Sequence, residues 1–201
     1  MGKRLFDLFF SLFILIVTAP LFFLCMTLVM ISSRGPVFYA HTRVGRKGKP
    51  FRCLKFRTMY QDADRKLEPL LAANPSMMQE WQTYFKLRKD PRITFVGKFL
   101  RKTSLDELPQ FWNVFKGDMS IVGPRPLTQY EVSHYLKHKA PQILSLRPGL
   151  TTLWITKGRN KLSLEKRIEL EEYYVNHRSF WLDCKLIFRT IFIMIFPRGS
   201  Y

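Results

Sequence analysis

Residues 8–30, LFFSLFILIVTAPLFFLCMTLVM, carry no charged side chain and are mostly apolar. A helix rises about 1.5 Å per residue, so a run of this length reaches across a hydrocarbon core of roughly 30 Å. The run is too long for the apolar part of a signal peptide, and Ser32-Ser33-Arg34 is a poor cleavage site. Residues 1–33 are therefore predicted to form a membrane helix that is not removed.

The flanking charges and one proline argue against a simple crossing. Lys3 and Arg4 precede the run, and several basic residues follow it, beginning with Arg34. The positive-inside rule places both ends on the cytoplasmic side. Ala19-Pro20 lies near the middle, where a proline kinks or breaks a helix. A helix that enters, bends at Pro20 and returns satisfies both observations, although proline also occurs in spanning helices, so residue pattern alone leaves both topologies open.

Composition narrows the class of partner. The 201 residues contain 33 Lys and Arg against 15 Asp and Glu, a formal net charge of +18, which indicates an anionic partner. Aromatic residues make up 15% of the chain, which together with the apolar run favours anionic membrane lipid. No nucleic-acid partner is expected, because the basic residues are scattered rather than gathered on a recognition helix. The three cysteines are too far apart for a zinc site or a disulfide framework.

The rest of the chain, residues 34–201, shows no linker and is predicted to be one compact cytosolic catalytic domain. Val37–Val44 and Phe51–Thr58 have the pattern of two strands joined through a Gly-bounded turn, a β-hairpin. The remaining segments favour helices, so the fold class is mainly α with a small hairpin; these helices cover residues 61–71, 76–88, 95–101, 128–139 and 163–176. Residues 182–196 are apolar but interrupted by charges, which suits an amphipathic helix in the membrane interface.

The stretch Ser104-Leu105-Asp106-Glu107-Leu108-Pro109 admits two interpretations. Ser104 and Glu107 have the spacing of a capping box, in which both side chains satisfy backbone amides at a helix start. The same helix start would stabilise Asp106 as a carboxylate, available as a nucleophile, and would attract a phosphate. The cap and the catalytic role are compatible, and spacing alone does not decide between them.

Several basic side chains are candidates for phosphate binding. An enzyme that attacks a diphosphate neutralises negative charge with guanidinium groups, lysines and usually Mg²⁺ held by carboxylate. The candidates lie beside turns and Pro or Gly breaks, where binding residues concentrate; they are Lys55, Arg57, Arg101, Arg125, Arg147 and Arg159. Each one taken alone is better explained as a solvated surface charge, and the functional interpretation rests on the group.

Several motifs in a fixed order give the chain a family resemblance. It resembles the bacterial sugar transferases, or monotopic phosphoglycosyl transferases, over nearly its whole length. The motifs that carry the resemblance are Lys55-Phe56-Arg57-Thr58-Met59, Ser104-Leu105-Asp106-Glu107-Leu108-Pro109-Gln110, Trp112-Asn113-Val114, Lys116-Gly117-Asp118-Met119-Ser120 and Gly123-Pro124-Arg125-Pro126.

The resemblance implies a re-entrant helix in the bacterial inner membrane, an active site at the cytoplasmic face and a two-step reaction. Asp106 would attack the β-phosphorus of a UDP-sugar, release UMP and keep the phosphosugar on its carboxylate. Undecaprenyl phosphate would then accept the phosphosugar, the first membrane step in the synthesis of a glycoconjugate, exopolysaccharide or O-antigen. Glu107, next to Asp106, would help to hold the Mg²⁺ that the family requires.

The resemblance also assigns Lys55, Arg101, Arg125 and Arg159 to phosphate or nucleotide contacts, whereas Arg57 and Arg147 are candidates mainly from their charge. Many relatives have Ser-Pro where this chain has Ala19-Pro20, so the proline alone is expected to set the kink. The alternative function is a catalytically degenerate scaffold of the same family, anchored to the membrane. A homodimer is compatible with the sequence, which does not identify the sugar.

Overall fold

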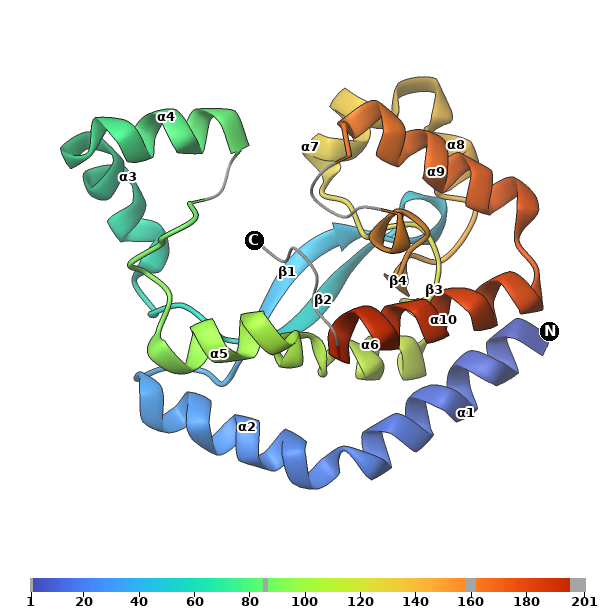
Figure 1. Ribbon diagram of the computed structural model, residues 1–201, viewed down its shortest axis with the longest axis horizontal. Coiled ribbons are helices and arrows are strands. Elements are labelled where there is room, and N and C mark those ends of the chain that lie inside the picture. Colours follow the sequence, from blue (N-terminus) through green and yellow to red (C-terminus); the bar gives the residue numbers. More distant parts are fainter. Residues whose placement is uncertain (1, 85–86, 158–161, 196–201) are drawn as a thin grey trace.

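The computed structural model describes residues 2–84, 87–157 and 162–195, and it is mainly helical, as predicted, with two small sheets. Two N-terminal helices, α1 (Gly2–Val17) and α2 (Ala19–Ser32), run along one side of the molecule, and the other elements lie above them (Figure 1). The predicted break at Ala19-Pro20 is present, because α1 and α2 meet at an angle of 64°. No single helix in the described ranges is long and apolar enough to cross a membrane, whereas the bent pair meets that test by length and composition.

A hydroxyl group takes part in the bend. Pro20 lies in the first turn of α2, where it lacks the N–H that would continue the hydrogen bonds of α1. Thr18, at the junction, donates its hydroxyl hydrogen to the Ile14 carbonyl at 2.7 Å. Such bonds to the preceding turn bend helices. The prediction that the proline alone sets the kink is therefore wrong, because a hydroxyl one residue before Ala19 also bonds the backbone there.

The predicted hairpin forms from β1 (Phe38–Val44) and β2 (Pro50–Phe56), which pair antiparallel through a short 3₁₀ turn. The outer edge of β2 is closed by Asn113 in α6 (Gln110–Lys116). The Asn113 amide accepts a hydrogen bond from the Leu54 N–H at 2.9 Å and donates one to the Arg52 carbonyl at 2.8 Å. This pairing fixes α6 against the strand that carries Lys55.

Most predicted helices are present, with bounds shifted by a few residues. Besides α1, α2 and α6, the helices are α3 (Ala63–Ala73), α4 (Pro75–Tyr84), α5 (Phe95–Thr103), α7 (Gln129–Glu131), α8 (Ala140–Ile143), α9 (Leu164–His177) and α10 (Phe180–Ile195). Residues 85–86 and 196 of the predicted helices lie outside the described residues. The predicted helix over 128–139 is wrong in form. After α7 the chain makes a π-helical turn and a 3₁₀ turn, and Lys137 takes a positive φ of 47°.

A second, parallel sheet was not predicted. It pairs β3 (Ser120–Val122) with β4 (Gly149–Thr151), and three residues are too few for a recognisable alternation. Gly123 and Gly149 pass so closely that a Cβ on Gly149 would overlap the Gly123 backbone. The two glycines let the loop after β3 pack on β4.

Two of three clusters of buried side chains in the described residues hold the elements around the N-terminal helices together. One joins β3, α6, α9 and α10 and contains Val114, Met119, Tyr174 and Leu186, among others. The other seats α2 on β2 and α5 and contains Cys25, Val29, Phe56 and Leu100. The strand β2 and the helix α5 therefore rest directly on α2.

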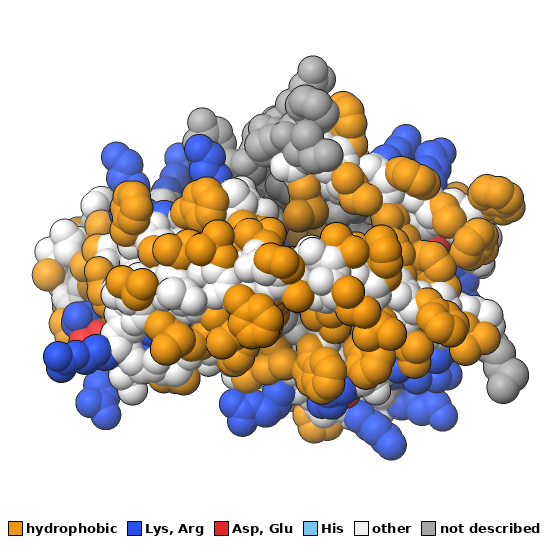
Figure 2. All heavy atoms as spheres, turned by 90° about the horizontal axis from the view of Figure 1, so that it is seen from below, with side chains coloured by type: hydrophobic (Ala, Val, Ile, Leu, Met, Phe, Trp, Pro, Cys, Tyr) orange, Lys and Arg blue, Asp and Glu red, His pale blue; other side chains and the backbone are white. Residues whose placement is uncertain are grey.

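The underside of the molecule is largely apolar, and Lys and Arg side chains gather along its rim (Figure 2). The helices α1, α2, α5 and α10 carry many exposed apolar side chains; they include Phe9, Phe13, Phe23, Ile31, Phe95, Trp181, Phe188 and Phe192. Trp181 is 80% exposed and Phe95 87%. A contiguous apolar face of this kind is typical of a membrane or protein contact.

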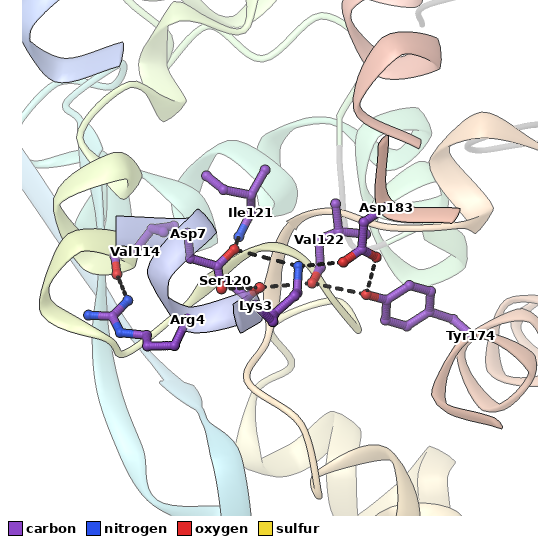
Figure 3. Close-up of polar contacts among 9 residues, drawn as sticks. All are labelled: Lys3, Arg4, Asp7, Val114, Ser120, Ile121, Val122, Tyr174 and Asp183. Carbon is purple, nitrogen blue, oxygen red and sulfur yellow. Dashed lines mark hydrogen bonds and ion pairs between the residues drawn. The ribbon is translucent and has the colours of Figure 1, made fainter. Parts of the chain in front are cut away.

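A buried polar network ties α1 to the rest of the fold (Figure 3). Asp7 is only 2% exposed, and its carboxylate accepts hydrogen bonds from the Ser120 hydroxyl at 2.8 Å and the Ile121 N–H at 3.1 Å. The Lys3 Nζ lies 2.7 Å from an oxygen of Asp183 in α10 and 3.5 Å from an oxygen of Asp7. Buried carboxylates of this kind are stable only when paired.

Two further contacts complete the network. The Tyr174 hydroxyl in α9 donates to the other oxygen of Asp183 at 2.7 Å. The Arg4 guanidinium donates to the Val114 carbonyl at 2.6 Å, at the end of α6 (Figure 3). It also donates to the neighbouring Phe115 carbonyl at 2.7 Å. The first turns of α1 therefore bind β3, α6 and α10 at once.

Candidate active site

A cleft of about 830 Å³ opens between the hairpin, the loop after β2 and the turn that follows α5. Five residues predicted for the site line it together, namely Lys55, Arg57, Arg101, Asp106 and Glu107. Lys55 comes from β2, Arg101 from the last turn of α5, and the two acids from a 3₁₀ turn, Leu105–Glu107, between α5 and α6. Residues far apart in sequence thus meet in one cleft.

The acidic pair does not sit in a capping box. Ser104 adopts the left-handed conformation (φ 58°, ψ 17°) that ends α5, and its side chain makes no capping hydrogen bond. An N-cap residue needs an extended backbone, so the predicted box at Ser104 and Glu107 is wrong. A capping box with the same spacing does occur at Thr128 and Glu131. A non-glycine residue in the left-handed region is uncommon and concentrates at functional sites.

Lys55 holds the two carboxylates side by side. Its Nζ lies 2.6 Å from a Glu107 oxygen and 3.9 Å from an Asp106 oxygen. Burial favours the neutral form of Lys55, but the adjacent carboxylates of Glu107 and Asp106 outweigh it and raise the pKa of Lys55 above its ordinary value. Lys55 is therefore a fixed positive charge at the floor of the cleft.

Burial controls the protonation of Asp106, which is 8% exposed. Removal from water raises the pKa of Asp106 to about 6, and the positive charges of Lys55 and Arg101 limit that rise. The carboxyl group is then mostly ionised at pH 7 and protonates just below it. The helix-end explanation for an ionised Asp106 is not the dominant effect, because burial pushes in the opposite direction.

Arg101 is aimed at the cleft by a neighbouring threonine. Its Nε donates to the Thr58 hydroxyl at 2.8 Å. Burial lowers the pKa of Arg101, and the nearby Asp106 works against that shift. Gly97, one turn earlier in α5, lets the helix touch the chain after β2, since a Cβ there would overlap the Thr58 carbonyl oxygen. The position of Arg101 thus depends on a glycine and a threonine.

Arg57 and Arg147 are engaged elsewhere. The Arg57 guanidinium donates to the carbonyls of Ser33, at 2.6 Å, and Pro36, and so caps the end of α2, although its side chain also lines the cleft. Arg147 donates from Nε to the Gly117 carbonyl at 2.7 Å and lines other hollows. The structure does not bring these two guanidinium groups to the acidic pair. Arg159 lies outside the described residues.

Arg125 reaches the cleft only through an aromatic neighbour. Its guanidinium carbon lies 5.4 Å from the centre of the Trp154 ring, and Trp154 lines the cleft. The Arg125 backbone N–H donates to a carboxylate oxygen of Glu171 at 3.0 Å. Burial raises the pKa of Glu171 to about 8, so this carboxyl group holds a proton at neutral pH. Sequence reasoning missed Glu171 because it lies in a run of charged helical residues that looks solvated.

The cleft also carries aromatic rings that sequence reasoning missed. Tyr39 and His41 in β1, and Tyr60 after β2, line its wall. The rings of Tyr39 and His41 lie 6.2 Å apart. Burial and the nearby Arg43 lower the pKa of His41, which favours its neutral form. Alternate residues of a strand share a face, so the spacing of Tyr39 and His41 in the predicted hairpin was an available signal.

The acidic pair offers two carboxylates to a metal ion. Within the described ranges, no group of three His, Cys, Asp or Glu side chains is placed to hold one. Mg²⁺ usually keeps several waters and takes one or two carboxylates together with substrate phosphates. Asp106 and Glu107 fit that donor set.

Comparison with known proteins gives a consistent picture. A family model described as bacterial sugar transferase matches residues 1–197. The exopolysaccharide production protein ExoY of Sinorhizobium fredii is 46% identical over 200 residues, which is 100% of this chain and 88% of that protein. The undecaprenyl-phosphate galactose phosphotransferase of Salmonella typhimurium is 43% identical over 199 residues, 99% of this chain and 41% of that protein. The UDP-glucose:undecaprenyl-phosphate glucose-1-phosphate transferase of Klebsiella pneumoniae is 37% identical over 215 residues, again 99% and 41%.

Proposed function

The chain belongs to the bacterial sugar transferase family, and on this premise we propose that it transfers a sugar 1-phosphate from a UDP-sugar to undecaprenyl phosphate and releases UMP. The names of the Salmonella and Klebsiella relatives support this reaction, with galactose and glucose respectively as the sugar. The observation that carries the proposal is the buried carboxylate of Asp106, held beside Lys55 and Glu107 in an open cleft.

In the first step, an oxygen of the Asp106 carboxylate attacks the β-phosphorus of the UDP-sugar. The bond between that phosphorus and the bridging oxygen breaks, and UMP leaves with the bridging oxygen and its electron pair. Ionisation of Asp106 near neutral pH suits a nucleophile. Lys55 and Arg101 line the same cleft and neutralise the negative charge that builds up on the phosphate oxygens.

In the second step, a phosphate oxygen of undecaprenyl phosphate attacks the phosphorus of the aspartyl phosphosugar. The bond to Asp106 breaks, which regenerates the carboxylate and gives the diphosphate-linked lipid. Mg²⁺ bound by Asp106 and Glu107 would supply charge neutralisation on the diphosphate. The planar rings of Tyr39, His41 and Tyr60 give the uracil base a surface on which to stack.

The apolar underside supports a place at the bacterial inner membrane, with the cleft facing the cytoplasm. The bend between α1 and α2 and the basic residues at both ends of the pair suit a re-entrant segment that stays in one leaflet. In this arrangement the phosphate of a membrane-bound polyprenyl lipid meets the cleft at the membrane surface. Anionic lipid attracts the basic rim shown in Figure 2.

The test is UMP release by the purified chain with Mg²⁺, undecaprenyl phosphate and a panel of UDP-sugars. We expect Asp106→Asn to lower the rate by at least about 10³-fold, because the amide is not a nucleophile. Asp62→Asn, at an exposed ion pair outside the cleft, is the matched control and keeps the rate. Without acceptor, the wild-type chain releases one equivalent of UMP and gains the mass of the phosphosugar.

Two results contradict the proposal in different ways. Full activity of Asp106→Asn removes the nucleophile. A wild-type chain that is inert with every nucleotide sugar, yet binds acidic liposomes in a salt-sensitive way, favours the membrane-anchored scaffold instead.

A further inference from the structure

A second cavity, of about 490 Å³, lies between the start of α1, the strand β3 and the start of α10. It shares no lining residue with the cleft that holds Asp106. Five basic residues line it, and they come from segments far apart in the sequence: Lys3, Arg4, Arg46, Arg147 and Arg178. The proposed reaction uses none of the side chains that converge on this cavity.

The cavity has an excess of positive charge. Its two acidic residues, Asp7 and Asp183, are buried and already bonded to Lys3 (Figure 3). These acids therefore offset little of the charge of the arginines. Burial lowers the pKa of Arg147, and the nearby positive charges of Arg4 and Arg46 lower it further. Asp7 opposes this shift but does not reverse it, as expected where guanidinium groups crowd together beside few acids.

Three of the arginines also have donors to spare. Arg46 uses Nε to bond the Ser145 carbonyl at 2.9 Å, and Arg147 uses Nε to bond the Gly117 carbonyl at 2.7 Å. Within the described part of the chain, no hydrogen bond or ion pair joins the terminal nitrogens of Arg46 and Arg147, or the side chain of Arg178, to another residue. Guanidinium groups with free paired N–H donors match the geometry of a phosphate.

The other side of the cavity is aromatic and continues onto the apolar underside. Phe6 and Phe180 line the cavity, with ring centres 5.8 Å apart in an edge-to-face contact. Phe180 is 58% exposed, and Phe9 and Trp181 extend the apolar surface along α1 and α10. A ligand with a phosphate at one end and hydrocarbon at the other would bind the arginines with its phosphate and the aromatic rings with its hydrocarbon. Free phosphate would contact only the arginines.

We propose that this cavity binds the phosphate group of an anionic glycerophospholipid, with its acyl chains lying on the exposed aromatic residues of α1 and α10. The lipid would neutralise Arg46, Arg147 and Arg178 and would fix the end of α1 at the membrane surface. This inference rests on the membrane location within the proposed function and is independent of the chemistry at Asp106. It gives the lipid a site separate from that of the polyprenyl acceptor.

The experiment titrates the full chain, in a neutral detergent, with short-chain phosphatidylglycerol, short-chain phosphatidylcholine or glycerol 3-phosphate, and follows Tm. A ligand that binds the folded chain raises Tm. We expect phosphatidylglycerol to raise Tm and the other two probes to have little effect at the same concentration. The double variant Arg46→Gln/Arg178→Gln is expected to bind phosphatidylglycerol about tenfold more weakly, since two charge-assisted contacts are lost.

The control variant is Lys185→Gln/Arg189→Gln, which removes two exposed charges from α10 outside the cavity and keeps the wild-type affinity. Arg178→Gln alone, which breaks no hydrogen bond, guards against misfolding of the double variant and should weaken binding in the same direction. Equal weakening in the control means general charge attraction and overturns the site. An equal response to glycerol 3-phosphate means a site for free phosphate and also overturns it. UMP release on the same preparations reports separately on the catalytic cleft.

Discussion

The carboxyl group of Asp106 sets the pH dependence expected of the first half-reaction. Its pKa of about 6 means that acidification protonates the nucleophile just below neutrality. We expect single-turnover UMP release to be nearly constant above pH 7 and to fall about tenfold per pH unit well below pH 6.

A substitution at Lys55 provides a second test of this pH profile of UMP release. Lys55 stabilises the charged form of Asp106, so Lys55→Met should move the acidic limb to higher pH as well as lower the rate. The measurement is the single-turnover rate from pH 5 to 8 in both forms. A wild-type profile that stays flat to pH 5 contradicts the assignment.

Because its pKa is raised, Glu171 is expected to make the folded chain less stable as pH rises. An ordinary ion-paired acid, with a lowered pKa, has the opposite effect. The folded pKa of Glu171, about 8, lies above the ordinary value of 4.5, so the folded chain keeps a proton that the unfolded chain loses between these values. Wild-type stability therefore declines as pH rises through this window. Glu171→Gln removes this decline. The free energy of unfolding of Glu171→Gln, relative to that of wild type, should therefore increase by several kcal/mol between pH 5 and 9, at roughly 1.4 kcal/mol per pKa unit.

The adjacent residue offers a matched control for Glu171. Glu172 is half-buried and pairs with Lys139 at 2.7 Å. Glu172→Gln should change the free energy of unfolding by an amount that does not increase between pH 5 and 9. Thermal unfolding of the three forms at each pH is the measurement, and parallel curves for Glu171→Gln and wild type would refute a protonated Glu171.

At the scale of elements, the seating of α5 depends on Gly97. A methyl group there would overlap the Thr58 carbonyl and push the helix away from the end of β2. We expect Gly97→Ala to destabilise the fold by roughly 1–3 kcal/mol, which lowers Tm by about 2–4 °C per kcal/mol. UMP release should fall as well, because Arg101 would lose its bond to Thr58. Lys98→Ala, at an exposed position of the same helix, should leave both within error, and an equal loss there would remove the steric explanation.

Helices and the hairpin were predictable from sequence because their signals are repetitive. Alternation and Gly-bounded turns defined β1 and β2, and the long apolar run with Pro20 defined the bent pair α1 and α2. Short or irregular elements were not predictable. The strands β3 and β4 have three residues each, and their pairing depends on close passage of two glycines distant in sequence.

The candidate site shows the same division. Ser104 and Thr128 both precede a glutamate by three residues, yet only Thr128 forms a capping box, because α5 forces Ser104 into the left-handed conformation. Charge identified Arg101 and Arg57 alike, but only the fold distinguishes an arginine aimed into the cleft from one that caps α2. Tertiary contacts decided these roles, and local patterns do not encode them.

At the scale of the whole molecule, the bent helix pair predicts that both of its ends lie on one side of the membrane. Gly2→Cys and Arg34→Cys, each made with Cys184→Ser, place single accessible thiols at the start of α1 and after α2, since Cys25 and Cys53 are buried. We expect both thiols to react with a membrane-impermeant reagent in inside-out vesicles and neither to react in intact cells. Labelling of residue 2 only from outside the cell would instead establish a spanning helix.

The buried network around Lys3 and Asp7 has a consequence for how the protein is made. The ribosome delivers α1 first, but the partners of Asp7 in β3 follow more than a hundred residues later, and Asp183 later still. Under the proposed membrane location, α1 and α2 reach the bilayer during synthesis while the buried Asp7 still lacks its final partners. Lys3 meets Asp183 only after α10 has left the exit tunnel, so the network around α1 is completed at the end of synthesis.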